Sequence, residues 1–336
     1  MRTTISQIAR EAGVSPATVD RVLNDREGVR RRTRDIVLQV AHQLGYFGPA
    51  TAIAAAPDQV RLDFVLPGGT NSFIRNLKRH LLEESQARGG ISVTVHEIEG
   101  FDAERLSAKL GDLRGRTDAA GIVALDHPQV REAVNELAKS GVRIGTLVSD
   151  IPTVQKVGYV GIDNRAAGRL AGLLLGRLLP PGPHKVAVFI GSLAYRGHEE
   201  REMGFRSILS EDFPEVRITG TAEVSDDRDM AYTETLRFLE RGDISGIYNI
   251  GSGNQGIARA LRETRRAKDT VFVGHDLTDA TRLMLLDRTM DAVIDQNARV
   301  EAREIVRLLT SSVLGSTEPG YLPRLQVVFR ENLPTE

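Results

Sequence analysis

The stretch Thr4-Ile-Ser-Gln-Ile-Ala-Arg-Glu-Ala-Gly-Val-Ser-Pro-Ala-Thr-Val-Asp-Arg-Val-Leu-Asn24 carries the strongest fold signal in the chain. Its apolar residues recur at helical spacing before and after Gly13, and glycine readily adopts the left-handed conformation that ends a helix. Thr4 and Gln7 have the spacing of a capping box, and Ser15 before Pro16 is typical of the start of a second helix. We therefore predict two short helices joined by a tight turn.

A third amphipathic segment begins at Thr33 and stops at Gly45. The apolar residues expected to face the other two helices are Ile36, Val37, Val40, Ala41 and Leu44. Together the three helices make a helix-turn-helix unit, in which the second helix enters the major groove of DNA. On the residues alone, a three-helix bundle with a solvated charged exterior and no DNA partner remains an alternative.

The outward face of the second helix carries the candidate DNA contacts. Arg21 can donate two hydrogen bonds to guanine O6 and N7, and Thr18 and Asn24 are short groups suited to phosphates or base edges. Pro16 and Ala17 can offer only apolar contact, for example with a thymine methyl group. The arginines beside the third helix suit phosphates; they are Arg30, Arg31, Arg32 and Arg34.

Residues 4–24 resemble the opening of the lactose repressor/purine repressor (LacI) family, T-I-x-D-V-A-x-x-A-G-V-S-x-x-T-V-S-R-V-L-N, and Leu44-Gly-Tyr46 resembles the family's L-G-Y. The resemblance implies binding to operator DNA, with positions 16 and 17 and Arg21 reading bases. Gln7 and Asp20 stand where the family usually has Asp and Ser, so Asp20 is expected to pair with an arginine or accept from cytosine N4 rather than face phosphate. The predicted DNA-binding residues are Thr4, Ser15, Pro16, Ala17, Thr18, Arg21, Asn24, Arg30, Arg32, Tyr46 and Ile53.

Residues 47–59 are alanine-rich and bounded by Pro49 and Pro57, which marks a domain boundary. The resemblance implies a hinge helix in this segment that wedges a leucine into the minor groove. Ala54 and Ala56 stand where the family usually has an arginine and that leucine, and Ile53 could serve as a substitute wedge. A plain flexible linker is an equal alternative.

Residues 60–336 alternate apolar runs with amphipathic stretches, beginning with a strand over 60–66 and a helix over 73–87. This alternation predicts parallel sheets covered by helices, and a segment of this length favours two lobes over one core. The predicted fold is an all-α helix-turn-helix head over 1–46, a linker over 47–59 and a two-lobed α/β effector domain over 60–336.

Polar side chains follow several of the predicted strands, at the edge where open parallel sheets bind ligands. Carboxylates, amides and guanidinium groups suit a polyhydroxylated ligand, and Phe73 supplies a stacking face. The candidates are Asn71, Asp126, Asp150, Asp163, Asn164, Arg196, Arg201, Asp276 and Gln296. Taken singly, each is more often a helix cap or a surface turn, and this applies to Asp150 and Asp163 in particular.

The body resembles the same family more loosely. Val160-Gly-Ile-Asp-Asn-Arg-Ala-Ala-Gly168, Arg201-Glu-Met-Gly-Phe205 and Val273-Gly-His-Asp276 are similar to its V-G-x-D-N-x-x-A-G, R-x-x-G-F and V-G-x-D. The resemblance implies the type I periplasmic-binding-protein fold with three chain crossings, here an N-lobe of about 60–160 and 296–319 and a C-lobe of about 161–295 and 320–336. It also implies that Asp276, Arg201, Gln296 and the 71–73 loop contact the effector, and it places Asn254 at the cleft or its rim.

Gly251-Ser-Gly-Asn-Gln-Gly256 keeps a second interpretation open. It follows a predicted strand and precedes a predicted helix, and Asp276 lies about 20 residues further on, which makes a formal dinucleotide fingerprint. The protein would then be a DNA-binding sensor of NAD(H) or another nucleotide. A hydrolase is disfavoured because the chain has neither G-x-S-x-G nor H-E-x-x-H. We expect no enzymatic activity, no metal and no resident cofactor.

Composition narrows the class of protein. The chain has no cysteine, which excludes disulfides, cysteine-ligated zinc fingers and thiol nucleophiles. Its net charge of −1 conceals a basic head, because residues 1–50 hold eight arginines against five acidic residues, a balance that suits contact with phosphate. A signal peptide and a run of 18 apolar residues are both missing from the sequence, so a cytoplasmic location is expected.

These features predict an effector-gated transcription regulator, more often a repressor than an activator. A homodimer is expected to place two heads on a near-palindromic operator. A sugar, polyol or sugar derivative is the favoured effector.

Overall fold

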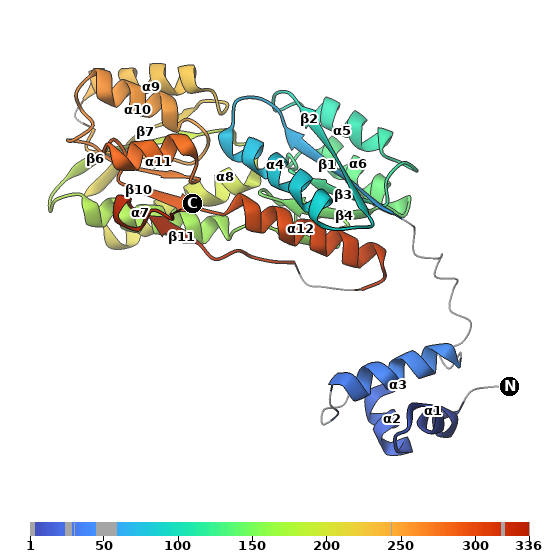
Figure 1. Cartoon of the computed structure of the whole chain (residues 1–336). Helices are drawn as coiled ribbons and strands as arrows, with labels where there is room; N and C mark the ends of the chain where they lie inside the picture. The colour runs from blue at the N-terminus through green and yellow to red at the C-terminus, as the bar shows by residue number, and fades with distance from the viewer. Residues whose placement is uncertain are drawn as a thin grey trace. The chain divides into compact units, whose positions relative to one another are not determined.

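The computed structural model describes residues 4–23, 29, 31–44, 59–242, 244–316 and 320–335, and the chain divides into two compact units, residues 1–58 and 59–336 (Figure 1). The first unit holds three helices, α1 (Ile5–Ala12), α2 (Pro16–Leu23) and α3 (Arg31–Gln43). The three predicted helices are confirmed, and the third begins two residues before the predicted start at Thr33. The predicted turn is also confirmed, because Gly13 lies in the left-handed region with φ +65°.

Local hydrogen bonds explain where the helices of the head begin. The Thr4 N–H donates to Gln7 Oε1 at 2.9 Å, which is one half of the predicted capping box. The Thr18 N–H donates to Ser15 Oγ at 3.2 Å, so Ser15 caps α2 as predicted.

The core of the head is a small apolar cluster of Ile8, Ala9, Val19, Val22, Val37 and Ala41. Two residues predicted to face inward do not. Ile36 and Leu44 are 41% and 37% exposed. Ile36 flanks the stripe formed by Val37 and Ala41 at i, i+4, and Leu44 follows the end of α3, where the partner helices no longer cover it.

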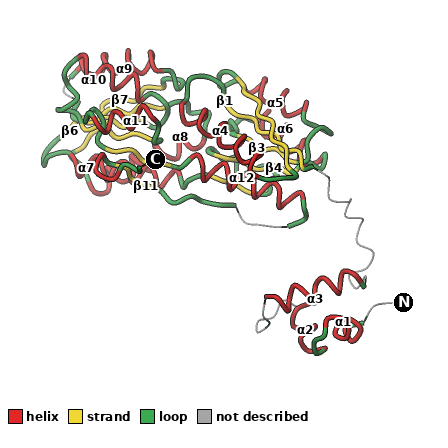
Figure 2. Tube along the Cα trace, viewed as in Figure 1, coloured by secondary structure: helices red, strands yellow, loops and turns green. Residues whose placement is uncertain are grey.

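The second unit contains two sheets. The N-lobe sheet is entirely parallel in the order β2-β1-β3-β4-β5. Its strands are β1 (Val60–Pro67), β2 (Ile91–Ile98), β3 (Ala119–Ile122), β4 (Arg143–Leu147) and β5 (Gly158–Val160), and its helices are α4 (Ser72–Ala87), α5 (Ala103–Asp112), α6 (Pro128–Lys139) and α12 (Ala298–Val313). Figure 2 shows these strands flanked by helices on both faces.

The C-lobe sheet has the order β11-β10-β9-β8-β6-β7 and is parallel except for β11, which runs antiparallel to β10. Its strands are β6 (His184–Ile190), β7 (Val216–Glu223), β8 (Gly246–Asn249), β9 (Val271–His275), β10 (Ala292–Asp295) and β11 (Gln326–Val328). Its helices are α7 (Asn164–Leu178), α8 (Arg196–Asp212), α9 (Arg228–Arg241), α10 (Asn254–Glu263) and α11 (Asp279–Leu286), and a 3-10 turn, η1 (Arg330–Asn332), follows β11. The buried side chains of α7 and α8 fill one side of this sheet, and those of α9, α10 and α11 fill the other.

The chain passes between the lobes three times: after β5, after β10, and between α12 and β11. Although α12 follows a C-lobe strand, its buried residues belong to the N-lobe core. The β11 strand then returns to pair with β10. The fold class implied by the resemblance, a helical head with a two-lobed α/β domain of parallel sheets, is confirmed, with one antiparallel edge strand added.

Helices α7 and α8 approach so closely that only glycine fits between their backbones. A Cβ placed on Gly168 would lie 1.9 Å from the carbonyl oxygen of Arg201, and one on Gly204 would lie 2.1 Å from the carbonyl oxygen of Arg165. Both glycines belong to motifs quoted above, the A-G at 167–168 and the R-x-x-G-F at 201–205. The motifs therefore set the distance between two backbones, and that distance positions Arg201.

Candidate functional site

Two adjoining cavities lie between the lobes, beyond the carboxyl ends of the strands, as parallel sheets predict. Counting space that is open to solvent, they hold about 470 Å³ (inner) and about 410 Å³ (outer) not filled by protein atoms. Asn71, Phe73, Gly251 and Asp276 line both, so the cavities form one bent site. Four of the predicted effector residues line the inner cavity together with Phe73: Asn71, Arg201, Asp276 and Gln296.

Arg201 is the central cation of the inner cavity and is only 3% exposed. Its Nε donates to Asn164 Oδ1 at 2.7 Å, one terminal nitrogen donates to the Ile250 carbonyl at 2.9 Å, and the other lies 3.5 Å from Gln296 Oε1. The hydrogen-bond partners of this guanidinium among the described residues are amide and carbonyl oxygens, not carboxylates. Three of the five N–H groups of Arg201 are used in these contacts, so Arg201 can donate further hydrogen bonds to a ligand.

Asp276 completes a chain of polar groups from Arg201 across the site. Gln296 Nε2 donates to Asp276 Oδ1 at 2.8 Å, and Asp276 adopts a left-handed backbone with φ +70°, directly after β9. Burial raises the pKa of Asp276 to about 7, while the charge of Arg201 opposes that rise. Near neutral pH the Asp276 carboxyl can therefore both accept and donate hydrogen bonds, as a partner of ligand hydroxyl groups must.

Asn71 connects the two lobes. Its Oδ1 accepts from the N–H groups of Phe73 and Ile74 and so caps α4. Its Nδ2 donates across the cleft to Asp226 Oδ2 at 3.2 Å. A second contact between the lobes is made by the Gly197 N–H, which donates to Ser149 Oγ at 3.2 Å. The lobes are therefore closed on one another in this structure.

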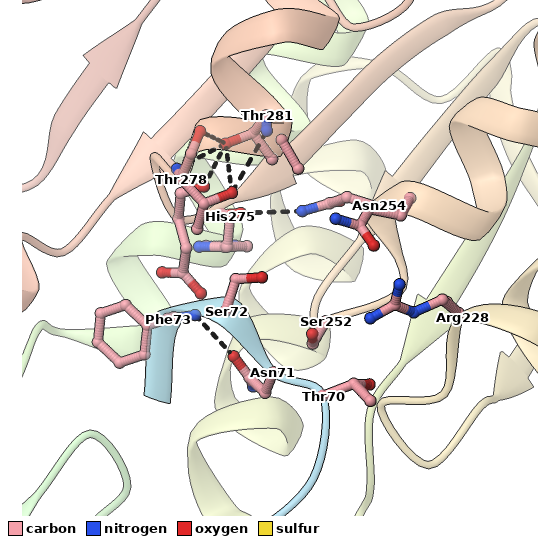
Figure 3. A pocket seen from close by; sticks show the side chains of 14 residues that line it. Thr70, Asn71, Ser72, Phe73, Arg228, Ser252, Asn254, His275, Thr278 and Thr281 are labelled. Carbon is pink, nitrogen blue, oxygen red and sulfur yellow. Dashed lines mark hydrogen bonds between the residues drawn. The ribbon is translucent and has the colours of Figure 1, made fainter. Parts of the chain in front are cut away.

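The outer cavity is lined mainly by hydrogen-bonding groups (Figure 3). Asn254 lies at the start of α10 and donates to the His275 carbonyl at 3.0 Å, which fixes its side chain at the wall of the cavity. Thr278 caps α11, and Thr281 Oγ1 donates to the Asp276 carbonyl at 2.8 Å. Arg228 reaches the cavity from the first residue of α9.

Five of the candidate residues at the strand ends do not line either cavity: Asp126, Asp150, Asp163, Asn164 and Arg196. Asp126 forms an ion pair with Arg131 at 2.6 Å. Asp150 accepts a hydrogen bond from Thr146 and forms an ion pair with Lys156 at 3.0 Å. Arg196 donates to Glu200 at 2.8 Å. Asp163 caps α7 by accepting from the Ala166 N–H at 2.9 Å, which agrees with its alternative interpretation as a helix cap.

The site also contains residues that sequence reasoning did not identify: Asp226, Arg228, His198, Ser149, Ser252 and Tyr195. Asp226 precedes α9 in a polar loop and lies 155 residues from its partner Asn71 in the chain. Tyr195 precedes α8, yet its ring packs into the N-lobe core against Phe101, with ring centres 5.3 Å apart. Contacts across such distances in sequence leave no local signal.

The glycine-rich turn at 251–256 holds a protein carboxylate. Asp226 Oδ1 accepts from the Ser252 N–H at 2.8 Å, and a Cβ on Gly251 would come within 2.5 Å of the same oxygen. Gly256 is required for a different reason, because its Cβ would lie 1.9 Å from the Arg228 carbonyl oxygen of α9. Since a dinucleotide pyrophosphate needs this turn free of negative charge, the geometry disfavours the nucleotide interpretation.

The head presents the predicted base-reading residues to solvent. Pro16, Ala17 and Arg21 are exposed on α2, and Thr18 is half-buried. Thr4 and Ser15 are exposed at the starts of α1 and α2. Asn24, Arg30, Tyr46 and Ile53, and the side chain of Arg32, lie outside the described residues, so their predicted DNA contacts stay predictions.

The described part of the chain shows neither a metal-binding cluster nor a membrane-spanning helix. No group of three His, Cys, Asp or Glu residues there is placed to hold a metal ion. No helix there is long and apolar enough to cross a membrane.

Comparison with known proteins agrees with this architecture. Residues 4–48 match the model of bacterial regulatory proteins of the lacI family, and residues 62–317 match a periplasmic binding protein domain. The HTH-type transcriptional regulator CelR of Thermobifida fusca is 27% identical, over 95% of this chain and 94% of that protein. Catabolite control protein A of Priestia megaterium is 26% identical, over 82% of this chain and 75% of that protein.

A solved structure shows the same fold in the body of the chain. It is an ABC transporter solute-binding protein from Burkholderia graminis, in complex with D-arabinose. It superposes with a TM-score of 0.77 at 19% identity, over 83% of this chain and 98% of that one. The fold and the site thus define a DNA-binding transcription regulator with a periplasmic-binding-protein-like domain. The chain belongs to the LacI family of bacterial regulatory proteins, and its relatives are transcriptional regulators rather than enzymes.

Proposed function

We propose that this regulator binds a sugar, polyol or sugar derivative between its lobes and that the bound effector changes its affinity for an operator. The main support is the series of side-chain contacts that joins Arg201, Gln296 and Asp276. All three residues line the inner cavity, as does Phe73. A guanidinium, an amide and a carboxyl group in series can bind neighbouring hydroxyl groups, and the Phe73 ring offers an apolar face to a sugar ring. The D-arabinose held by the Burkholderia protein and the catabolite control named for the Priestia relative support this ligand class.

The effector would act through the relative position of the lobes. Each ligand can shift such an equilibrium only by its differential affinity for the two arrangements. A ligand between Asn71 and Asp226 contacts both lobes at once, so it favours whichever arrangement brings those residues together. We infer that lobe movement reaches the heads through residues 47–59 and changes their spacing.

We also propose a homodimer on a near-palindromic operator, acting as a repressor. Leu283 and Leu286 of α11 are 61% and 51% exposed, and Leu82 of α4 is 37% exposed. Burial of large apolar side chains on these two helices against a second copy would remove them from water. Two heads would then be available for two half-sites.

A thermal-shift screen tests the effector class directly. Sugars, polyols, sugar acids, purines, amino acids and NAD(H) are each added to the purified full-length chain. A ligand at 100 times its Kd adds roughly 2.7 kcal/mol to the free energy of unfolding, which raises the melting temperature visibly. We expect hits among the carbohydrates. A shift with NAD(H) alone would assign the 251–256 turn to a nucleotide and overturn the proposal.

Replacing Arg21 tests the DNA face. Arg21→Ala should weaken operator binding by about 1–3 kcal/mol, because a bidentate contact to guanine is lost. Binding to non-specific DNA should fall far less, and Arg10→Ala, which removes an exposed arginine from α1, provides the matched control. Fluorescence anisotropy with operator and scrambled duplexes measures both affinities. An equal loss on the two duplexes would make Arg21 a phosphate contact instead of a base reader.

A further inference from the structure

Glu301 is a buried glutamate whose carboxyl group lacks hydrogen bonds in the described part of the body. It lies in the first turn of α12, is completely buried, and has no hydrogen-bond partner for either carboxyl oxygen among the described residues. Buried polar atoms almost always have a partner, and a buried carboxyl group without one lowers the stability of the state that contains it. An arrangement of the chain in which this carboxyl meets water would relieve that cost.

The position of Glu301 shows which arrangement that is. It follows the second crossing between the lobes by a few residues. Its electrostatic neighbours come from both lobes: Tyr159 on β5, Arg201 on α8, Asp276 after β9 and Asp295 on β10. The Tyr159 hydroxyl in turn lies 3.2 Å from the Ile162 carbonyl, in the first crossing. Glu301 therefore lies at the hinge, beneath the effector site.

We propose that Glu301 is a pH-sensitive brake on lobe closure: its carboxyl group is neutral while the lobes are closed and ionises when they part and water reaches the hinge. The inference rests on the proposed function only in assuming that the lobes move. Glu301 lines neither the inner nor the outer cavity. An effector must then supply free energy to close the lobes, and more of it at higher pH.

The charges around Glu301 fix the sign of this effect. Burial raises the pKa of Glu301 well above its usual range, Asp276 and Asp295 raise it further, and Arg201 lowers it. The closed state therefore holds more protons than an open state in which this carboxyl has its ordinary pKa. Stabilisation of the closed state is complete below the ordinary carboxyl pKa and is lost as the pH rises through the closed-state pKa. Raising the pH opens the lobes.

Other titrating groups can be separated from Glu301. Asp276 acts in the same direction, but only up to its closed-state pKa of about 7. The pKa values of His198 and His275 are lowered by burial, so both rings stay neutral above pH 7. Burial raises the pKa of Tyr159, near which Asp150 and Glu200 also lie. Burial also raises the pKa of Asp295, which acts in the same direction as Glu301. The part of the pH response that Glu301→Gln abolishes therefore reports Glu301.

Energy transfer between dyes on the two lobes measures this response without any ligand. The chain has no native cysteine, so dyes attach only at Ala108→Cys on α5 and Glu240→Cys on α9, both exposed. Labelled full-length protein is mixed with excess unlabelled protein, so that each assembly carries one labelled chain. As the pH is raised above the ordinary carboxyl range, the open-to-closed ratio should rise by up to about tenfold per pH unit for each coupled proton.

Glu301→Gln should open less than the wild type as the pH rises, because its amide cannot ionise. Glu304→Gln is the matched control on the same helix, since Glu304 is already paired with Arg303 and Arg307, and it should open with pH as the wild type does. Glu301→Met, which fills the site with an apolar chain, gives the same test if the glutamine variant does not fold. A wild type insensitive to pH, or a Glu301→Gln variant that titrates like it, would overturn the proposal. If the lobes open as the pH rises but no compound in the thermal-shift screen raises the melting temperature, the effector assignment is rejected and the role of Glu301 is retained.

Discussion

Gly204→Ala is expected to cost the body about 3 kcal/mol or more of its free energy of unfolding. The new Cβ would lie 2.1 Å from the Arg165 carbonyl oxygen and 2.9 Å from the Arg169 nitrogen, both backbone atoms of α7. Neither atom can rotate away, so α7 and α8 must move apart, and overpacking of this kind costs 1–3 kcal/mol or more. The melting temperature should fall by about 2–4 °C for each kcal/mol.

Gly111→Ala is the matched control for this prediction. Gly111 lies in α5, is exposed, and has no atom within 4 Å of its ideal Cβ position. The same substitution there should be neutral or stabilise by up to about 1 kcal/mol, because alanine favours helix. Chemical denaturation of both variants measures the difference. A Gly204→Ala variant as stable as Gly111→Ala would mean that α7 and α8 separate at no cost, and that the R-x-x-G-F motif has another purpose.

The sequence predicted the elements and the motif residues because both are local in the chain. Apolar periodicity located the first strand to within one residue. The turn at Gly13 follows from the backbone freedom of glycine, and the cap at Ser15 follows from the hydrogen bond that its hydroxyl group can accept. The strand-end pattern proposed Arg201, Asp276 and Gln296 among other candidates, and the resemblance selected these three, all of which line the inner cavity. What failed was the choice among neighbouring polar residues at the strand ends.

Which polar residue faces the cleft depends on where the strand ends and on the backbone conformation of the one or two residues that follow it. Strand β3 ends at Ile122, so Asp126 lies beyond the edge and pairs with Arg131 instead of facing the cleft. After β4, Val148 has φ +65°, and Ser149 rather than Asp150 lines the cavity. Arg196 and Arg201 are five residues apart on one helix, which puts them on different faces. Periodicity with an uncertain boundary cannot resolve any of these cases.

Residues of the two lobes that meet across the cleft could not be predicted at all. Asp226 carries no motif, and its role follows only from the lobe closure that brings it to Asn71 and from the turn at Ser252. Glu301 is similar, because a glutamate in the first turn of a helix ordinarily faces solvent and favours the helix N-terminus. Glu301 is buried because it lies at the hinge, where groups from both lobes surround it.

Arg201→Met should abolish effector binding, with a loss of affinity of at least about a hundredfold, while operator binding persists in the head. The methionine fills part of the volume, but it leaves Asn164 Oδ1 and the Ile250 carbonyl without their donor. Each buried acceptor left without a donor costs about 1–3 kcal/mol, so the free energy of unfolding of the body should also fall. The variant separates cleanly from Gly204→Ala, because the backbone contact between α7 and α8 is untouched.

Electrostatics gives the Arg201 substitution a second readout. The charge of Arg201 lowers the pKa of Asp276 and of Glu301 and also that of His275. Without it, Asp276 should titrate above about 7, so closure of the ligand-free lobes should persist to higher pH than in the wild type. Arg201→Lys keeps the charge but not the planar fork, so it should restore the wild-type pH response and only part of the affinity. Calorimetric titration with the carbohydrate that gives the largest thermal shift, together with the energy-transfer measurement, distinguishes the two contributions. If lysine restored full affinity, Arg201 would act on the effector through its charge alone, and the hydrogen bonds of the guanidinium would serve only to hold Asn164 and Gln296 in place.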